Sequence, residues 1–246
     1  MPNRATSFGD GLFETMVWDG VTIRFYDMHR NRLLGGMEVL GMDVTQIHFE
    51  GLNDLLTTNF SGEKKRIRWT VFRDGAGKYS PETSRVNQLV QLSEFVKAPK
   101  LKREVGASDR TQLFPTVWSS FKSLNSLPYV LANQERKDRG WDEIILLDYR
   151  GYISEAGASN IFWIKKGTVF TPSLSCSCID GVSRRVILEH LVQNAISYVE
   201  GEFLLSEIED AELVFVSNCT GISYLQKFRT KTYSTDPPEF LKDILV

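Results

Sequence analysis

Two patterns of apolar residues along the chain predict β-strands. Apolar and polar residues alternate strictly over residues 66–72 (RIRWTVF), which is typical of a strand with one buried face. Residues 144–147 (IILL) are apolar throughout, which indicates a short strand buried on both faces. Similar runs bounded by turn residues predict further strands over residues 12–18, 21–25, 86–95, 159–164, 168–171 and 211–217.

A period near that of the α-helix appears in four other segments. Apolar residues recur at helical spacing over residues 28–40, and glycine follows as a stop signal. Pro128 fits the first turn of a helix over residues 128–139, because its missing N–H has no partner there. A further helix is expected around residues 45–59. The last predicted helix begins at Gly181 and carries the clearest apolar stripe, formed by Leu188, Leu191, Val192, Ala195, Ile196 and Val199.

Residues 97–116 interrupt these patterns. They are basic and polar and contain prolines and a glycine, so we interpret them as the passage between two domains. Strands and helices are expected on both sides of this passage. The expected division is into residues 1–112 and residues 113–246.

The composition excludes several classes of protein. The 246 residues are 42% hydrophobic and 24% charged, as in an ordinary globular protein. A net charge of −2 gives no reason to expect a nucleic-acid or membrane-surface partner, and no apolar run is long enough to cross a bilayer. Residues 1–7 lack the apolar core of a signal peptide, and the cysteines and histidines form neither a disulfide framework nor a zinc pattern. We therefore expect a cytoplasmic protein without a bound metal.

Three features of the second half fit one cofactor. Lys122 lies between an apolar run and a helix start, from where its amine can point into a cleft. Glu155 ends a predicted strand beside small residues, where a ligand can approach the backbone closely. Residues 181–183 (GVS) begin a helix, whose free N–H groups and dipole favour a bound phosphate. A lysine, a carboxylate and an anion site are what pyridoxal 5′-phosphate (PLP) requires, although each feature taken alone also fits a structural role.

The order and spacing of five segments resemble those of class IV aminotransferases: FKSLN (121–125), DEIILL (142–147), SEAGASNIF (154–162), TP (171–172) and GVSR (181–184). The segments RATSFGDGLFET (4–15) and HRNRL (29–33) extend this resemblance over nearly the whole chain. The family has fold type IV of PLP enzymes and includes branched-chain aminotransferases, D-amino-acid aminotransferases and 4-amino-4-deoxychorismate lyases. The resemblance implies a small α/β N-terminal domain, a larger barrel-like C-terminal domain and a cofactor held in the cleft between them.

The resemblance also assigns roles to residues. Lys122 would be the Schiff-base lysine and proton shuttle, and Glu155 would pair with the pyridine nitrogen of PLP. Arg32 would bind the phosphate together with the backbone N–H groups of Val182 and Ser183. Family members are usually homodimers that act on small amino-acid-like molecules. A second phosphate loop is matched in position, although not in residue type, by Asn218, Cys219 and Thr220.

Among these activities we favour 4-amino-4-deoxychorismate lyase, which forms 4-aminobenzoate and pyruvate on the folate route. Residues 4–11 (RATSFGDG) resemble the opening motif of the lyases, and residues 73–81 resemble their Arg-Gly-Tyr-Ser-Pro-type loop. The chain is also short for a branched-chain aminotransferase. The candidate substrate contacts are Phe13, Arg73 and Lys78, of which the last stands where the lyase loop commonly has arginine.

Two alternatives stay open. The first alternative is a transaminase that acts on branched-chain or D-amino acids with a 2-oxo acid acceptor. Residues 122–125 (KSLN) favour it, because they match a motif of the D-amino-acid enzymes. Against it, residues 86–95 contain no Arg-x-His carboxylate trap. The other is a catalytically inactive homologue that acts as a binding protein, and the joint retention of the three cofactor residues argues against it. Ser177 replaces an expected glycine, so the loop before the phosphate helix is expected to differ in shape.

Overall fold

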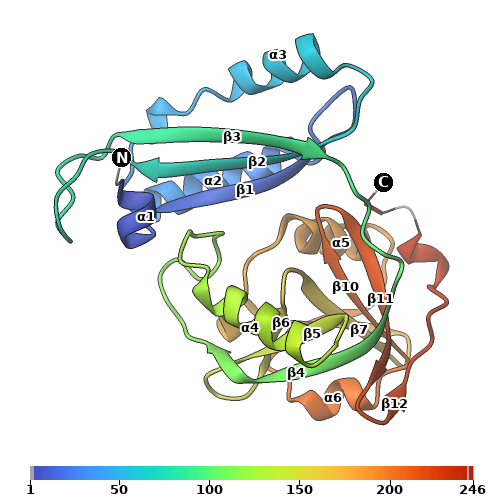
Figure 1. Cartoon of the computed structure of the whole chain (residues 1–246). Coiled ribbons are helices and arrows are strands. Elements are labelled where there is room, and N and C mark those ends of the chain that lie inside the picture. Colours follow the sequence, from blue (N-terminus) through green and yellow to red (C-terminus); the bar gives the residue numbers. More distant parts are fainter. Residues whose placement is uncertain (1–2, 243, 246) are drawn as a thin grey trace. The chain divides into compact units, whose positions relative to one another are not determined.

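The computed structural model describes residues 3–242 and 244–245, and the chain forms two compact units (Figure 1). Unit 1 comprises Met1–Val96 together with Phe121–Asn125. Unit 2 comprises Lys97–Ser120 together with Ser126–Val246. The segment Phe121–Asn125, which contains the candidate lysine, is therefore inserted into the run of unit 2 but packs as part of unit 1.

Unit 1 is an antiparallel sheet with helices on one face. Its strands are β1 (Gly11–Trp18), β2 (Lys65–Arg73) and β3 (Val86–Glu94), in that order across the sheet. The helices are α1 (Arg4–Phe8), α2 (Tyr26–Val39) and α3 (Phe49–Phe60), with a 3₁₀ turn η1 (Val44–Gln46) before α3. Alternate residues of β2 are buried, as the sequence pattern predicts, and they pack with apolar residues of α2 and α3 in one core.

Unit 2 is built on one mixed sheet that curls, with strand order β6-β5-β4-β11-β10-β7-β8-β9 and β12 paired to β11. Its helices are α4 (Leu127–Asp138), α5 (Val182–Gln193) and α6 (Leu205–Glu209), with 3₁₀ turns η2 (Leu174–Cys176) and η3 (Glu239–Leu241). The strands are β4 (Leu101–Leu113), β5 (Glu143–Asp148), β6 (Ile153–Ala156), β7 (Asn160–Lys165), β8 (Thr168–Pro172), β9 (Tyr198–Gly201), β10 (Leu213–Asn218), β11 (Gly221–Phe228) and β12 (Lys231–Thr232).

The continuous apolar runs of unit 2 are strands covered on both faces. In β7, Ile161 and Trp163 pack inside the curled sheet, whereas Phe162 and Ile164 pack against α5. A separate cluster around Ala132 of α4 covers the outer face of β5. The sequence therefore predicts these buried strands correctly, because apolar residues at every position need apolar neighbours on both faces.

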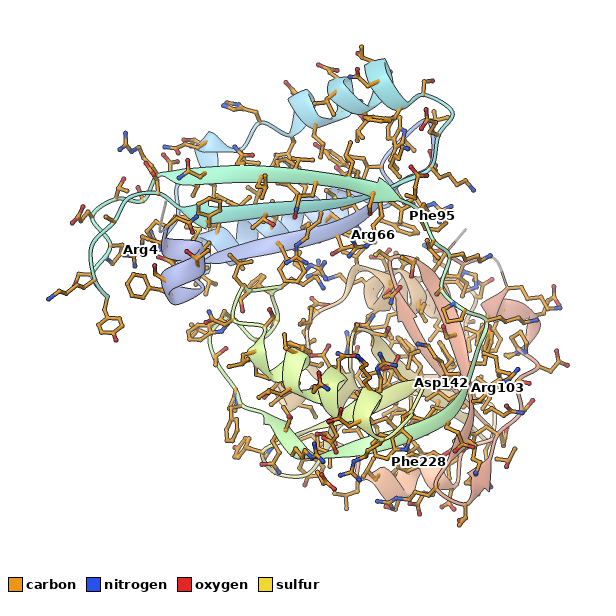
Figure 2. All side chains as sticks on the ribbon, in the orientation of Figure 1. Arg4, Arg66, Phe95, Arg103, Asp142 and Phe228 are labelled. Atoms are coloured by element: carbon orange, nitrogen blue, oxygen red, sulfur yellow. The ribbon has the colours of Figure 1, made fainter. Side chains whose placement is uncertain are left out.

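Strand β4 corrects the expected passage over residues 97–116. The thirteen-residue strand β4 pairs in parallel with β11 at its start and with β5 further along, and the compact units divide after Val96 instead of after residue 112. Gly106 looked like a break, yet a Cβ there would lie 2.1 Å from the Trp141 ring, so the glycine lets that ring pack on the strand. Asp142, labelled in Figure 2, accepts the backbone N–H of Arg103 at 2.7 Å where the two parallel strands begin.

Two other expectations are corrected. Residues 21–25 do not form a strand: Asp19 accepts two backbone N–H groups in a tight turn, and only an isolated bridge joins Trp18 to Ile23. The helix from Gly181 ends at Gln193, because Ala195 has a left-handed backbone (φ 54°), and Val199 lies in strand β9. None of the helices among the described residues is long and apolar enough to cross a membrane.

Candidate cofactor site

Lys122 is held against strand β1 of unit 1. The backbone N–H of Phe13 donates to the carbonyl of Lys122 (2.8 Å), and the N–H of Leu124 donates to the carbonyl of Gly11 (2.9 Å). A Cβ at Gly11 would lie 2.6 Å from the carbonyl oxygen of Val71 and 2.7 Å from a methyl group of Leu124. Only glycine fits there, so the position of the lysine backbone depends on a glycine more than a hundred residues earlier.

The side chain of Lys122 lies over an aromatic ring. Its Nζ is 4.6 Å from the ring centroid of Phe13, and the guanidinium carbon of Arg68 is 3.9 Å from the same centroid. Both distances suit cation–π contacts. Phe13, expected from the sequence as a substrate contact, therefore supports the candidate catalytic amine, and Arg68 of β2 is a cation that the sequence analysis did not single out.

Arg32 is fixed by a buried carboxylate. Its Nε donates to Glu14 Oε1 (2.8 Å) and its Nη2 to Glu14 Oε2 (2.6 Å), and His29 Nδ1 lies 2.7 Å from the latter oxygen. All three side chains are buried. A bidentate pair of this kind fixes both the position and the plane of the guanidinium. Glu14 therefore fixes the candidate phosphate ligand Arg32, and the sequence analysis did not single it out.

The pKa values of Glu14 and His29 in this cluster are both shifted from their usual values. Burial by itself would raise the pKa of Glu14, but the charge and hydrogen bonds of Arg32, together with His29, lower it to about 2. Burial lowers the pKa of His29 below its usual value despite the neighbouring carboxylate, and the positive charges of Arg32 and Lys122 act in the same direction. The cluster is thus an ionised Glu14–Arg32 pair beside a histidine that favours its neutral form.

Arg73, which the sequence analysis expects to contact substrate, is held by hydrogen bonds within unit 1. Its Nε donates to Asp10 Oδ2 (3.0 Å), its Nη1 to the carbonyls of Gly41 and Thr83, and its Nη2 to the carbonyl of Leu40. The side chain is 7% exposed. Every nitrogen of the guanidinium already has an acceptor, so Arg73 fastens the end of β2 to the loops around it.

Lys78 lies in an exposed loop that is tied down through its backbone. Arg4, labelled in Figure 2, donates from Nη1 to the carbonyls of Ala76 (2.9 Å) and Lys78 (2.8 Å), and from Nε to Asp10 Oδ2 (2.7 Å). Asp10 thereby joins Arg4 to Arg73 through one oxygen. The opening motif and the glycine-rich loop, which both resemble the lyases, thus form one hydrogen-bonded assembly within unit 1.

Glu155 lies in strand β6 of unit 2 and is 4% exposed. Its Oε1 accepts hydrogen bonds from the hydroxyl of Tyr129 (2.6 Å) and from the backbone N–H of Ile179 (3.3 Å). Strand β6 pairs with β5, which places Glu155 opposite Leu146. Tyr129 is a second residue that the sequence analysis missed, because nothing in the helix pattern of α4 distinguishes it from an ordinary core aromatic residue.

The N-terminus of α5 is locked by buried side chains. Asn160 Nδ2 donates to Ser183 Oγ (2.9 Å) and to the carbonyl of Ser217 (2.9 Å), and Ser183 Oγ lies 3.2 Å from Ser217 Oγ. A Cβ at Gly181 would lie 2.2 Å from Asn160 Oδ1, so this tight junction of β7, β10 and α5 requires glycine. The first N–H groups of a helix, here those of Val182 and Ser183, have no acceptors within the helix itself.

The turn formed by Asn218, Cys219 and Thr220 lies beside the β6–β7 connection. Asn218 Oδ1 accepts from the backbone N–H (2.9 Å) and hydroxyl (2.6 Å) of Thr220, and its Nδ2 donates to Ser159 Oγ (3.0 Å). Since Asn160 pairs with Ser217 in the sheet, this turn and the start of α5 both adjoin the ends of β7 and β10. Unit 2 therefore brings together the two phosphate-binding segments predicted in it, the start of α5 and the turn 218–220, and the N–H of Ile179 binds Glu155.

The donor set suits PLP. A carboxylate that accepts two hydrogen bonds suits a protonated pyridine nitrogen, and a helix start that tolerates only glycine at its cap suits a close-lying phosphate. Unit 1 carries a fixed guanidinium, that of Arg32, and the amine of Lys122, which are two further groups of the kind that PLP chemistry uses. Ser177, which replaces the expected glycine, adopts a left-handed conformation (φ 64°), and so the loop keeps a glycine-like backbone without the glycine.

Comparisons with known proteins identify a family for the chain. The sequence model of the family described as amino-transferase class IV matches residues 11–224. A putative branched-chain-amino-acid aminotransferase of Methanocaldococcus jannaschii is 28% identical over 218 residues, which cover 85% of this chain and 75% of that protein. An aminodeoxychorismate lyase of Vibrio harveyi is 25% identical over 227 residues, which cover 88% of this chain and 82% of that protein.

The same fold occurs in solved structures. A putative 4-amino-4-deoxychorismate lyase of Legionella pneumophila superposes with a TM-score of 0.87 at 20% identity, covering 96% of this chain and 89% of that one. The family match and the shared fold identify a fold type IV enzyme that uses PLP. The chain belongs to the class IV aminotransferase family, which contains transferases and lyases.

Proposed function

We propose that the protein is a PLP-dependent 4-amino-4-deoxychorismate lyase that releases 4-aminobenzoate and pyruvate on the folate route. The observation that carries the choice of the lyase is the assembly of its two lyase-like segments. Asp10 of the opening motif binds Arg73 at the start of the glycine-rich loop, and Arg4 of the same motif binds the carbonyl of Lys78 within that loop. The two segments thus stabilise one conformation of the loop. The sequence similarity to the Vibrio harveyi lyase also supports the choice of a lyase.

In this proposal the residues of the chain divide the work. PLP, when bound, supplies an electron sink that stabilises a carbanion on the substrate. Lys122 anchors the cofactor covalently and, as a free amine, takes the proton from the substrate carbon. Glu155 binds the pyridine nitrogen, and Arg32, held by Glu14, binds the phosphate together with the N–H groups of Val182 and Ser183. Asn218, Cys219 and Thr220 are assigned to the second phosphate loop.

A transaminase is the second candidate function. Arg66 and Arg68 share one face of β2, and within the part of the chain that the structure describes neither forms an ion pair. Arg68, which lies over the same ring as the Lys122 amine, suits the second carboxylate of a dicarboxylic 2-oxo acid acceptor. The similarity to the Methanocaldococcus jannaschii protein favours the same activity.

The cofactor role is tested by chemical trapping. The purified protein is expected to be yellow, and borohydride is expected to fix the cofactor to Lys122, which intact-mass and peptide mass spectrometry would detect. The Lys122→Ala variant is expected to lose the covalent adduct, whereas Lys137→Ala, at an exposed position of α4, keeps it. A colourless protein that takes up no added PLP would overturn the proposal.

The reaction is tested by the products. Incubation with aminodeoxychorismate is expected to release 4-aminobenzoate and pyruvate in equal amounts, and Lys122→Ala is expected to reduce the rate by several orders of magnitude. A panel of L- and D-amino acids with 2-oxoglutarate runs in parallel. Keto-acid exchange without release of 4-aminobenzoate would replace the lyase with the transaminase.

We also propose, on the family resemblance, that the protein is a cytoplasmic homodimer. Light scattering of the purified protein would test whether it is a dimer.

A further inference from the structure

Tyr129 connects helix α4 to the candidate cofactor carboxylate. It lies in the first turn of α4, directly after Pro128, and its hydroxyl is 2.6 Å from Glu155 Oε1. Its ring packs on a small cluster that contains Leu113, Ala132, Ile144 and Leu146. The pair therefore consists of one partly buried aromatic side chain packed against a core cluster and one buried carboxylate in strand β6.

The proton of this pair belongs to the tyrosine. Burial raises the pKa of Tyr129 well above its usual value, and the negative charge of Glu155 acts in the same direction. A neutral phenol donates, so Glu155 Oε1 accepts a short hydrogen bond in addition to the one from the Ile179 N–H. Hydrogen bonds to a charged acceptor are roughly twice as strong as neutral ones, and both favour the ionised carboxylate.

The backbone on both sides of the pair is fixed as well. Asn133, one turn after Tyr129, donates from Nδ2 to the carbonyl of Tyr129 and to the carbonyl of Gly157, both at 2.9 Å. A Cβ at Gly157 would lie 2.9 Å from a methyl group of Ile144 and 3.2 Å from the Asn133 amide, so glycine permits this close approach. Helix α4 and the end of β6 are thereby joined on each side of the Tyr129–Glu155 hydrogen bond.

We propose that Tyr129 is a positioning residue for the cofactor: its hydroxyl fixes the orientation of the Glu155 carboxylate and keeps it ionised, so that it binds a protonated ring nitrogen. This inference rests on the proposed PLP function. Tyr129 acts through Glu155 and has no assigned contact with the reacting atoms. Without the Tyr129 hydroxyl, the Glu155 carboxylate would be more basic and would draw the proton from the ring nitrogen, which lowers the protonated fraction of that nitrogen. The carboxylate would also be less firmly oriented, which lowers the affinity for the cofactor.

The test compares two tyrosines of unit 2. Tyr129→Phe removes the hydroxyl in question, and Tyr233→Phe removes a buried hydroxyl that has no hydrogen-bond partner among the described residues. The readouts are the Kd of the apoprotein for PLP, the ¹⁵N NMR signal of ring-labelled bound PLP, and the Tm. Tyr129→Phe is expected to weaken PLP binding about ten-fold or more and to move the ring-nitrogen signal toward neutral pyridine. Tyr233→Phe is expected to leave Kd and signal unchanged.

The outcomes separate the inference from the function it rests on. If the wild-type protein takes up no PLP, the proposed function fails and the inference fails with it. If the wild type binds PLP and Tyr129→Phe matches Tyr233→Phe in Kd and ring-nitrogen signal, only the inference is overturned. A lower Tm with an unchanged signal also overturns it, because that describes a merely structural tyrosine. If Tyr129→Phe fails to fold, 3-fluorotyrosine at position 129 replaces it in the test, because it is a stronger hydrogen-bond donor of nearly equal size. It is expected to shift the ring-nitrogen signal in the opposite direction, toward protonated pyridine. An unchanged signal would overturn the inference.

Discussion

Glu14 illustrates how a single buried residue can organise its surroundings. It is a charged residue in the middle of a strand, where alternation places it on the core face with Leu12 and Met16. A carboxylate there is costly unless it is paired, and Arg32 and His29 supply the partners from helix α2. The cluster fixes the orientation of Arg32, and it makes the stability of the core of unit 1 depend on the protonation of Glu14.

The first prediction at this scale concerns pH. The pKa of Glu14 falls from 4.5 to about 2 in the folded protein, so the stabilisation is complete above about pH 4.5 and is lost as the pH falls toward about 2. The shift corresponds to roughly 3 kcal/mol of unfolding free energy. Urea unfolding at a series of pH values is expected to show this loss in the wild type, and Glu14→Gln is expected to be less stable at neutral pH with a flatter acid profile.

Glu38→Gln is the matched control for this experiment. Glu38 is exposed on α2, and its replacement is expected to change the unfolding free energy by less than about 0.5 kcal/mol at neutral pH. A Glu14→Gln protein with the stability and acid slope of the wild type would show that the buried cluster contributes nothing to folding.

At the scale of elements, the junction of β7, β10 and α5 is the most constrained part of unit 2. Asn160 from β7 and Ser217 from β10 are neighbours in the sheet, and both contact Ser183 of α5. The start of α5 is therefore fixed by side chains of two strands, which is what a helix N-terminus needs in order to present N–H groups to a phosphate in one geometry.

Gly181→Ala tests this junction. The new methyl group would overlap Asn160, whose amide would have to leave Ser183 and Ser217, so we expect a loss of about 2–4 kcal/mol in unfolding free energy and weaker PLP binding. Denaturant unfolding and cofactor titration are the measurements. Gly51→Ala in α3, where a methyl group meets nothing within 4 Å, is expected to be neutral or stabilising by about 1 kcal/mol. Equal behaviour of the two variants would contradict the assigned role of the junction.

At the scale of the whole molecule, the chain does not divide at one point. Strand β4 belongs to unit 2 because its partners β5 and β11 lie there, whereas the segment Phe121–Asn125 belongs to unit 1 because β1 is its partner. A boundary drawn from composition near residue 112 misses both facts. Strand pairing between distant residues decides which unit a segment joins, and composition does not report that pairing.

The sequence by itself determined most elements and their buried faces. Alternation located β2, and unbroken apolar runs located β5, β7 and β10, because a period of two or a run without polar residues reports directly which faces meet a core. Motif order pointed to the family, which the match over residues 11–224 confirms. The failures at Val21, Ala195 and β4 arose where a turn, a left-handed residue or a distant partner overrode the local pattern.

Only the tertiary structure decided which side chains support the predicted ones. The contacts of Lys122 with Phe13, of Arg32 with Glu14 and of Tyr129 with Glu155 join residues far apart in the chain. Arg73 is held by the Asp10 carboxylate and by three backbone carbonyls. The physical reason is that hydrogen-bond and ring contacts act over a few ångströms. Their partners are therefore fixed by how the strands and helices pack, which no local spacing along the sequence encodes.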